Sequence, residues 1–224
     1  MRKKILFIIL ALAAITGGLY ARQIFLERNY GLKVVAKETG KIADYLKDGD
    51  IIFQTSHYGQ SLAVQLVTHS PYSHCGIIYK EGDICYVAEA VQPVKKTPLN
   101  KWIARGDDGH FVIKRLKNAD KVLTAETLAK MKEVGNNFMG KNYDIYFNWS
   151  DENIYCSELV WKIYKRGADI EIGKLEKLRD FDLTNDIVQE IVKERYGNNI
   201  PLDETVISPV SILNSDLLVT VKSN

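Results

Sequence analysis

The sequence predicts an α+β fold in one domain, and three observations lead to this prediction. Short segments rich in β-branched and aromatic residues are grouped in the first half, whereas apolar residues at helical spacing dominate the second half. The composition is that of a globular protein, with 46% hydrophobic and 26% charged residues among 224. A chain of this length buries one sizeable core. We therefore expect a cluster of strands flanked by helices.

Four strands are expected, each apolar and bounded by glycine, aspartate or proline turn signals. They are the segments 51–53, 74–79, 84–91 and 111–116. A short helix from Ser61 to His69 lies between the first two of them, because the stretch is largely apolar and is closed by Ser70-Pro71.

The second half predicts four helices. Thr124 can cap a helix whose apolar residues recur at helical spacing up to Gly140. A second helix covers 154–165, and a third begins at Thr184 and stops at Gly197. Ser208-Pro209 is a cap and first-turn pair typical of a short last helix.

The amino terminus has the layout of a signal peptide. Arg2, Lys3 and Lys4 precede an uncharged stretch that runs from Ile5 to Ala21. That stretch is short for a membrane-spanning helix, and small residues near its end suit cleavage. A leucine within the cleavage pattern leaves a retained anchor open as the alternative.

The predicted organisation therefore has three parts. Residues 1–21 are a signal peptide or anchor, residues 22–43 are a connecting segment, and residues 44–224 form the folded domain. Either interpretation of the first segment places the domain outside the cytoplasm, in the periplasm or cell envelope. The 30 basic and 28 acidic residues are spread along the chain without a long basic block. Nucleic acid is therefore not an indicated partner.

Cys156 begins a predicted helix, in the segment Tyr155-Cys-Ser-Glu. The positive end of a helix favours a thiolate, and backbone N–H groups there, such as that of Ser157, can stabilise an oxyanion. A buried, inert core cysteine is the alternative. The three cysteines, Cys75, Cys85 and Cys156, are an odd number, so at least one stays free or pairs with another molecule. We expect the first two to lie on opposite faces of one hairpin, where they cannot form a disulfide.

His74 and Glu89 are the candidate partners of that thiol. His74 follows a turn and begins a strand, a position that suits a base. Glu89 is an acid within an apolar strand, where it either orients the histidine or points to solvent from the outer face. A two-residue hairpin loop puts the two side chains on one face of the sheet. With Glu81-Gly82 as the loop they pair directly, and with Gly82-Asp83 they are diagonal neighbours.

Four motifs together resemble the YiiX group of permuted papain-like NlpC/P60 proteins. They are Gly49-Asp-Ile-Ile-Phe53, Thr68-His-Ser-Pro-Tyr-Ser-His-Cys-Gly76, Glu89-Ala-Val91 and Tyr155-Cys-Ser-Glu-Leu-Val160, and Thr97-Pro-Leu-Asn-Lys-Trp102 adds to them. The resemblance runs from about residue 44 to Ser208-Pro209. It implies a circularly permuted papain-like fold, an antiparallel sheet flanked by helices, in which the histidine precedes the cysteine.

The resemblance also implies roles for individual residues. Cys156 matches the nucleophile, His74 the base and Glu89 the residue that orients the base. Gly140-Lys-Asn-Tyr143 is similar to a Gly-x-Pro-Tyr motif whose tyrosine lies beside the nucleophile, although Asn142 replaces the proline. Tyr143 is therefore a further candidate for the site, with a core aromatic as the alternative.

The implied activity is that of an exported cysteine amidase or peptidase acting through an acyl-enzyme on cell-wall peptides or related amides. A lipid acyltransferase or deacylase of the lecithin:retinol acyltransferase type, and a catalytically idle binding module, are the alternatives. The shape of the pocket separates them, because an amino-acid ligand needs placed charges and an acyl chain needs an apolar tunnel. We expect no metal or organic cofactor, since no zinc or phosphate-binding motif occurs. Substrate, signal cleavage and oligomeric state stay open.

Overall fold

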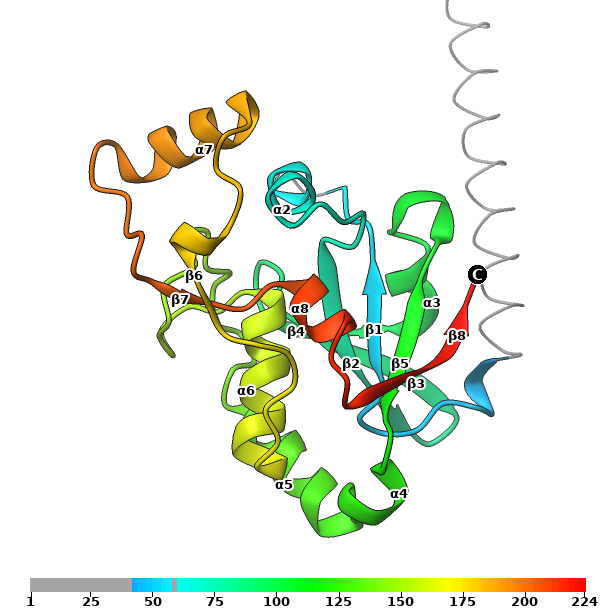
Figure 1. Ribbon diagram of the computed structural model, residues 1–224. Helices are drawn as coiled ribbons and strands as arrows, with labels where there is room; N and C mark the ends of the chain where they lie inside the picture. Colours follow the sequence, from blue (N-terminus) through cyan, green and yellow to red (C-terminus); the bar gives the residue numbers. More distant parts are fainter. Residues whose placement is uncertain (1–41, 58–59) are drawn as a thin grey trace, which may run out of the picture.

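A six-stranded antiparallel sheet with the order β4-β3-β2-β1-β5-β8 forms the centre of the structure (Figure 1). The structure is a computed structural model that describes residues 42–57 and 60–224. The predicted signal peptide or anchor and nearly all of the predicted connecting segment lie outside the described residues. The strands of the sheet are β1 (Ile51–Gln54), β2 (His74–Glu81), β3 (Ile84–Glu89), β4 (Lys95–Pro98), β5 (Val112–Leu116) and β8 (Leu218–Ser223).

Helices lie on both faces of this sheet and at one end of it (Figure 1). The α-helices are α2 (Ser61–Thr68), α3 (Leu99–Ile103), α4 (Ala119–Val122), α5 (Ala125–Asn136), α6 (Cys156–Ala168), α7 (Asp186–Tyr196) and α8 (Pro209–Leu213). Two short 3-10 helices, η1 (Asp107–Gly109) and η2 (Leu178–Asp180), and a small hairpin of β6 (Glu176–Lys177) and β7 (Thr205–Val206) complete the described elements.

Alternation along the central strands divides the interior into two cores. In β1, Ile51 and Phe53 belong to one buried cluster, whereas Ile52 belongs to the other. The first core lies under α6, which contributes Leu159 and Ile163. The second core is smaller and is covered by α3 and the turn around residues 42–46. Both faces of the sheet are therefore buried, and a side chain's position in the strand decides which core it enters.

Three predicted helix caps are confirmed by their hydrogen bonds. The Thr124 hydroxyl accepts from the backbone N–H of Thr127 at 3.2 Å at the start of α5. The Ser208 hydroxyl accepts from the N–H of Ser211 at 3.1 Å at the start of α8. Gly197 follows the last residue of α7 with a positive φ of 58°. Each cap satisfies backbone groups that the helix itself leaves without partners.

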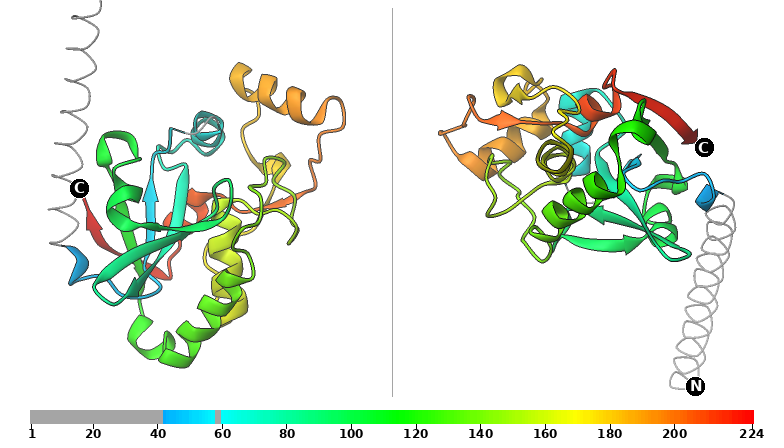
Figure 2. Two further views of the ribbon diagram at one scale, coloured as in Figure 1. Left: turned by 180° about the vertical axis from the view of Figure 1, so that it is seen from behind. Right: turned by 90° about the horizontal axis from the view of Figure 1, so that it is seen from below.

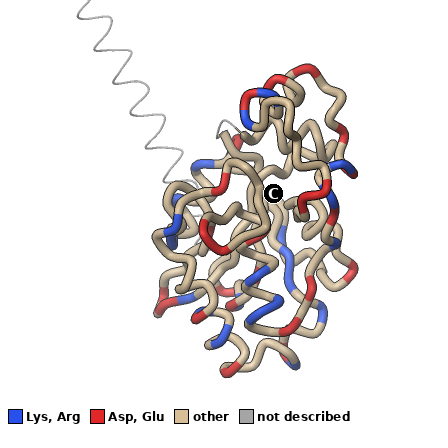
Figure 3. The backbone as a smooth tube through the Cα atoms, turned by 90° about the vertical axis from the view of Figure 1, so that its left-hand side faces the viewer, with Lys and Arg blue, Asp and Glu red and all other residues tan. Residues whose placement is uncertain are grey.

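Helices α2 and α7 stand next to one another at one end of the sheet, away from α4 and α5 (Figures 1 and 2). Helix α7 reaches this place through long extended segments on both sides, which include β6 and β7. Charged residues of both signs are interspersed over the side drawn in Figure 3. In the part of the chain that the structure describes, no helix is long and apolar enough to cross a membrane.

The predicted α+β class is confirmed, and the differences are local. The helix expected over 154–165 begins at Cys156 and continues to Ala168. Strands β4 and β8 were not predicted. The first of them, Lys95–Pro98, contains two lysines and a proline, which are poor strand residues, and it forms because it pairs with β3 as an edge strand.

Candidate active site

Cys156 is the first residue of α6, where the chain turns from an extended Tyr155 into the helix. The side chain is buried, with 4% of its surface exposed, and α6 packs against β2. The first backbone N–H groups of a helix have no partner within the helix. The sulfur therefore lies at a helix end that stabilises negative charge.

His74 is the first residue of β2 and lies between Cys156 and Glu89. Its Nε2 is 2.7 Å from Oε2 of Glu89, and a side-chain hydrogen bond also joins it to Cys156. Because Nε2 is engaged with the carboxylate, Nδ1 is the ring nitrogen left for the sulfur. The ring also stacks on Trp102, with the two centroids 5.8 Å apart. The imidazole is thus fixed in position on three sides.

The β2–β3 hairpin places His74 and Glu89 on the same face. Glu81 pairs with Ile84, so the loop is Gly82-Asp83, the second of the two loops considered from the sequence. Gly82 has a φ of 60°, which suits such a two-residue turn. Continuing this register makes Glu89 a diagonal neighbour of His74. The shared face is confirmed, and the alternative in which Glu89 points into solvent is wrong, because its side chain is fully buried.

Gly76 makes the diagonal contact possible. It lies between His74 and the end of the hairpin, opposite Glu89 in the continued register. A Cβ at this position would stand 2.4 Å from Cγ1 of Val87 and 2.7 Å from the carbonyl oxygen of Ala88. Only glycine lets β3 approach β2 this closely without a clash.

Glu89 accepts hydrogen bonds from three side chains besides the histidine. Thr97 donates to Oε1 at 2.6 Å, and Trp102 Nε1 and Arg105 Nη2 donate to Oε2 at 2.9 Å and 2.5 Å. A buried carboxylate is costly unless it is paired in this way. Sequence reasoning missed these partners, although the segment Thr97–Trp102 was part of the family resemblance.

The charges in this line of groups stabilise one another. Burial favours the neutral form of Glu89, but the hydrogen bonds and charges of His74 and Arg105 outweigh it and lower the pKa of Glu89 to about 2. Burial alone would likewise lower the pKa of His74, yet its hydrogen bonds with Cys156 and Glu89 and their negative charges raise that pKa to about 9. The histidine is therefore an imidazolium at neutral pH.

The thiol of Cys156 is ionised in the same arrangement. The hydrogen bond with Cys75 contributes most to lowering its pKa, burial opposes the shift, and the hydrogen bond and charge of His74 add to it. The net result places the pKa of Cys156 well below the ordinary value of a thiol. A thiolate and an imidazolium side by side are the reactive pair of a cysteine hydrolase.

The contact with Cys75 was not predicted, because the sequence placed that thiol only on one face of the hairpin, without a partner from another element. Cys75 faces the core under α6, and Cys85 faces the opposite core, as expected from the hairpin. All three cysteines are free and buried. Burial and the neighbouring Cys156 raise the pKa of Cys75, so it stays a neutral thiol that can donate to the thiolate.

Replacing Cys75 by alanine is therefore expected to weaken the thiolate without removing it. We expect the pKa of Cys156, measured from the pH dependence of its alkylation by iodoacetamide, to rise by about 0.7, the effect of one modest hydrogen bond. Cys75→Ser, which keeps a donor, should recover most of the lowered pKa. Cys85→Ala is the matched control, a buried cysteine on the other face, and should leave the pKa unchanged. The same pKa in Cys75→Ala and wild type would show that the second thiol only packs.

Residues 45–222 match a family described as permuted papain-like amidase enzymes, YaeF/YiiX, C92 family. The chain belongs to this family. It is also 46% identical over 173 residues to the uncharacterized protein YiiX of Escherichia coli (strain K12), which covers 77% of this chain and 84% of the relative. The crystal structure of the YiiX protein from Escherichia coli O157:H7 is similar, with a TM-score of 0.75 and 46% identity over 80% of this chain and 97% of that one.

That crystal structure is described as one of a metalloprotein. Within residues 42–57 and 60–224 of this chain, no group of three or more His, Cys, Asp or Glu side chains could hold a metal ion. Cys156, His74 and Glu89 are engaged with one another in a line, and Glu89 already receives donors on both of its oxygens. The described residues therefore do not fit a metal centre.

The fold places Tyr143 and Ser157 at the site as well. Tyr143 borders the hollows beside both Cys156 and His74, and burial and the charge of Cys156 raise the pKa of its hydroxyl. The hydroxyl of Ser157 donates to the carbonyl oxygen of Ile207 at 2.7 Å. If Ser157 stabilises an oxyanion, the donor is therefore its backbone N–H and not its hydroxyl.

Four other titratable side chains lie outside the site. Glu158 accepts from the N–H of Tyr155 at 3.4 Å and forms a buried ion pair with Lys162 at 2.7 Å, so it caps the helix and pairs within it. His57 and His69 are exposed and lie near aspartates, and His110 is near the carboxyl-terminal residue. None of the three borders the hollows at Cys156 and His74.

Proposed function

We propose that this protein is a cysteine amidase in which Cys156 is the nucleophile, His74 the general acid and base, and Glu89 the residue that orients and charges His74. The observation that carries the proposal is the buried line of these three groups, with the carboxylate at one end, the thiolate at the other and the imidazolium between them. Membership in a family of permuted papain-like amidases supports it.

The reaction begins when the thiolate of Cys156 attacks the carbonyl carbon of the amide and an S–C bond forms. Backbone N–H groups at the start of α6 stabilise the negative oxygen of the tetrahedral intermediate. His74 then transfers its proton to the amide nitrogen, the C–N bond breaks and the amine leaves. Water, deprotonated by the neutral His74, attacks the thioester, and the carboxylic acid and the free thiolate are released.

Tyr143 borders both hollows at the centre of this reaction, so it is placed to contact the substrate on either side of the scissile bond. Export to the periplasm or cell envelope is part of the proposal and depends on residues 1–41. Action on cell-wall peptides is a further part, and it depends on the identity of the substrate. A binding module with an idle triad is the alternative. The low pKa of Cys156 and the raised pKa of His74 favour the enzyme.

The pH dependence tests the charged pair. Turnover needs the thiolate of Cys156 and the proton on His74, so kcat/KM should rise with pH only through the lowered pKa of Cys156 and form a plateau across neutral pH. It should fall above a pH of about 9, where His74 loses its proton. The measurement is kcat/KM from pH 4 to pH 11 on a cleaved amide.

Alkylation of Cys156 by iodoacetamide over the same range, followed by peptide mass spectrometry, reports on the thiolate without a substrate. We expect labelling at this cysteine well below the pH at which a free thiol reacts, and little labelling of Cys85. Activity and labelling that both rise only through pH 8 to 9 would contradict the charged pair, because that is the behaviour of an ordinary thiol.

A further inference from the structure

Two cysteine side chains meet at the active site, although the proposed reaction needs only one. Cys75 and Cys156 belong to the same buried cluster, and a side-chain hydrogen bond joins their sulfurs. Cys75 lies on β2 and Cys156 begins α6, so the contact forms because α6 packs on β2. The backbone N–H of Cys75 donates to the same sulfur. Cys156 is therefore held against a second thiol as well as against His74.

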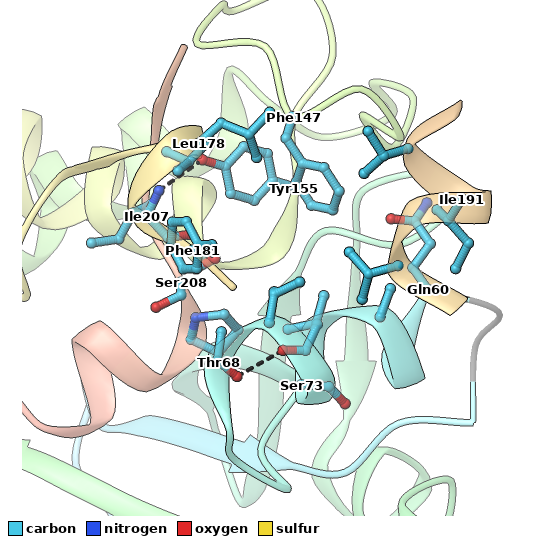
Figure 4. Close-up of a pocket in the computed structure, with 18 of the residues that line it drawn as sticks. Gln60, Thr68, Ser73, Phe147, Tyr155, Leu178, Phe181, Ile191, Ile207 and Ser208 are labelled. Atoms are coloured by element: carbon cyan, nitrogen blue, oxygen red, sulfur yellow. Dashed lines mark hydrogen bonds between the residues drawn. The ribbon is translucent and has the colours of Figure 1, made fainter. Parts of the chain in front are cut away.

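The two thiols differ in their access to solvent. Cys156 is 4% exposed and lines a hollow whose walls include Gln60, Tyr155 and Ser208 (Figure 4). That hollow contains roughly 810 Å³ of space between atoms, part of it open to solvent. Cys75 is fully buried and lines neither this hollow nor the one beside His74. A small solute that enters the hollow therefore reaches Cys156 and does not reach Cys75.

The two thiols also differ in charge. The hydrogen bond with Cys75 and the imidazolium of His74 lower the pKa of Cys156, whereas burial and the contact with Cys156 raise the pKa of Cys75. A thiolate is readily oxidised by a peroxide, and a buried neutral thiol is not. Oxidation therefore starts at Cys156, with a protonated thiol already beside it.

We propose that Cys75 and Cys156 form a reversible disulfide when the protein meets a peroxide, and that this bond switches the amidase off. Cys156 is the cysteine that the peroxide oxidises, and Cys75 is the cysteine that resolves the oxidised form. The sulfur chemistry stands on the contact between the two thiols. Its consequence for activity rests on the proposed amidase function, because a sulfur engaged in a disulfide cannot attack a carbonyl carbon.

The oxidation proceeds in two steps and consumes one molecule of hydrogen peroxide. The thiolate of Cys156 attacks one oxygen, an S–O bond forms, the O–O bond breaks, and the leaving hydroxide takes the proton of His74 to become water. The sulfur of Cys75 then attacks the sulfenic acid, and an S–S bond forms as the S–O bond breaks. The departing hydroxide takes the proton of Cys75 as a second water. The two sulfurs are oxidised, the peroxide is reduced and His74 is left neutral.

The first step prepares the second. The sulfenic acid of Cys156 is neutral, so one cause of the raised pKa of Cys75 disappears and burial alone opposes its ionisation. The attacking sulfur is already next to its target, so the step is intramolecular and needs no encounter. It competes with further oxidation of Cys156 to the sulfinic acid, which a thiol cannot reverse. A disulfide, in contrast, is reduced again by a dithiol.

Cys85 lacks the features that this reaction requires. It faces the core on the other side of the sheet, so its side chain points away from the other two cysteines. Burial raises its pKa, so it is not a reactive thiolate. Cys85→Ala is therefore the matched control for variants of Cys75.

Peptide mass spectrometry after treatment with hydrogen peroxide tests the sulfur chemistry without any substrate. Wild type that is alkylated and digested without a reductant should contain the Cys75 peptide linked to the Cys156 peptide, with the loss of two hydrogen atoms. Dimedone, which traps sulfenic acids, should label Cys156 strongly in Cys75→Ser and weakly in wild type. Cys85→Ala should give the same linked pair as wild type.

The reversibility of the inactivation tests the switch. After the same treatment, dithiothreitol should restore at least about tenfold more of the starting activity in wild type than in Cys75→Ser, whose Cys156 continues to the sulfinic acid. The serine keeps a hydrogen-bond donor, so this variant separates the disulfide from the hydrogen bond. Cys75→Ala repeats the comparison with an apolar side chain, and each activity is expressed relative to the same variant before treatment.

The two readouts separate this inference from the amidase function. Oxidation of Cys156 in wild type without a linked pair, or equal recovery of activity in wild type and Cys75→Ser, would overturn the switch and leave the amidase intact. A linked pair that leaves amide cleavage undiminished would also overturn the switch. A linked pair in a protein that cleaves no amide would support the sulfur chemistry and overturn the proposed function instead.

Discussion

Replacing Cys156 by alanine is expected to lower turnover by about four orders of magnitude or more, to the rate left by substrate binding alone. No other described group lies where it could attack in its place, because Cys75 stays protonated and Ser157 donates its hydroxyl to Ile207. The fold should be retained, since the change removes one sulfur atom from a core and costs about 1 kcal/mol. The measurements are kcat/KM and the free energy of unfolding.

The same variant has a second, independent readout. Mass spectrometry of wild type mixed with a slowly hydrolysed substrate should show an acyl group bonded to Cys156, and the alanine variant should show none. Cys85→Ala is the control and should form the adduct as wild type does. Undiminished hydrolysis by Cys156→Ala would refute its assignment as the nucleophile.

The second large effect is expected at Glu89. In Glu89→Gln the negative charge is lost, so the pKa of His74 should decrease, and the alkaline limb of the pH profile should move down from about pH 9. We expect kcat to fall by about two to four orders of magnitude, as is typical when the residue that orients a catalytic histidine is lost. The measurement is the full pH profile of kcat/KM beside that of wild type.

Glu89→Ala should in addition destabilise the protein by about 3 to 5 kcal/mol, because it leaves buried donors without their acceptor. The N–H of Trp102 and the hydroxyl of Thr97 both lose their partner. Asp50→Asn is the matched control: this buried carboxylate pairs with Arg115 at the opposite end of β1. It should lower stability and leave the pH profile unchanged. A Glu89→Gln variant whose alkaline limb stays at about 9 would contradict the role of Glu89.

Local features of the sequence were enough to predict the fold class, and they marked Cys156, His74 and Glu89 as candidates whose roles the family resemblance then implied. Apolar periodicity located the main strands and helices, and Thr124, Gly197 and Ser208-Pro209 marked helix ends through short-range hydrogen bonds. The relative positions of His74 and Glu89 could also be derived, because a two-residue loop in one hairpin fixes which side chains share a face. Whether the loop was Glu81-Gly82 or Gly82-Asp83 did not affect that conclusion.

Only the tertiary structure decided which groups surround the triad. Arg105 reaches Glu89 from beyond α3, and Cys75 meets Cys156 across 81 positions of the chain, because α6 packs on the face of β2 that carries Cys75. The hollow beside Cys156 forms between α2 and α7, which are separated by more than 100 residues. Periodicity along a chain reports the face that a residue occupies within its own element. It does not report which distant element covers that face, and that is decided by the packing of the whole core.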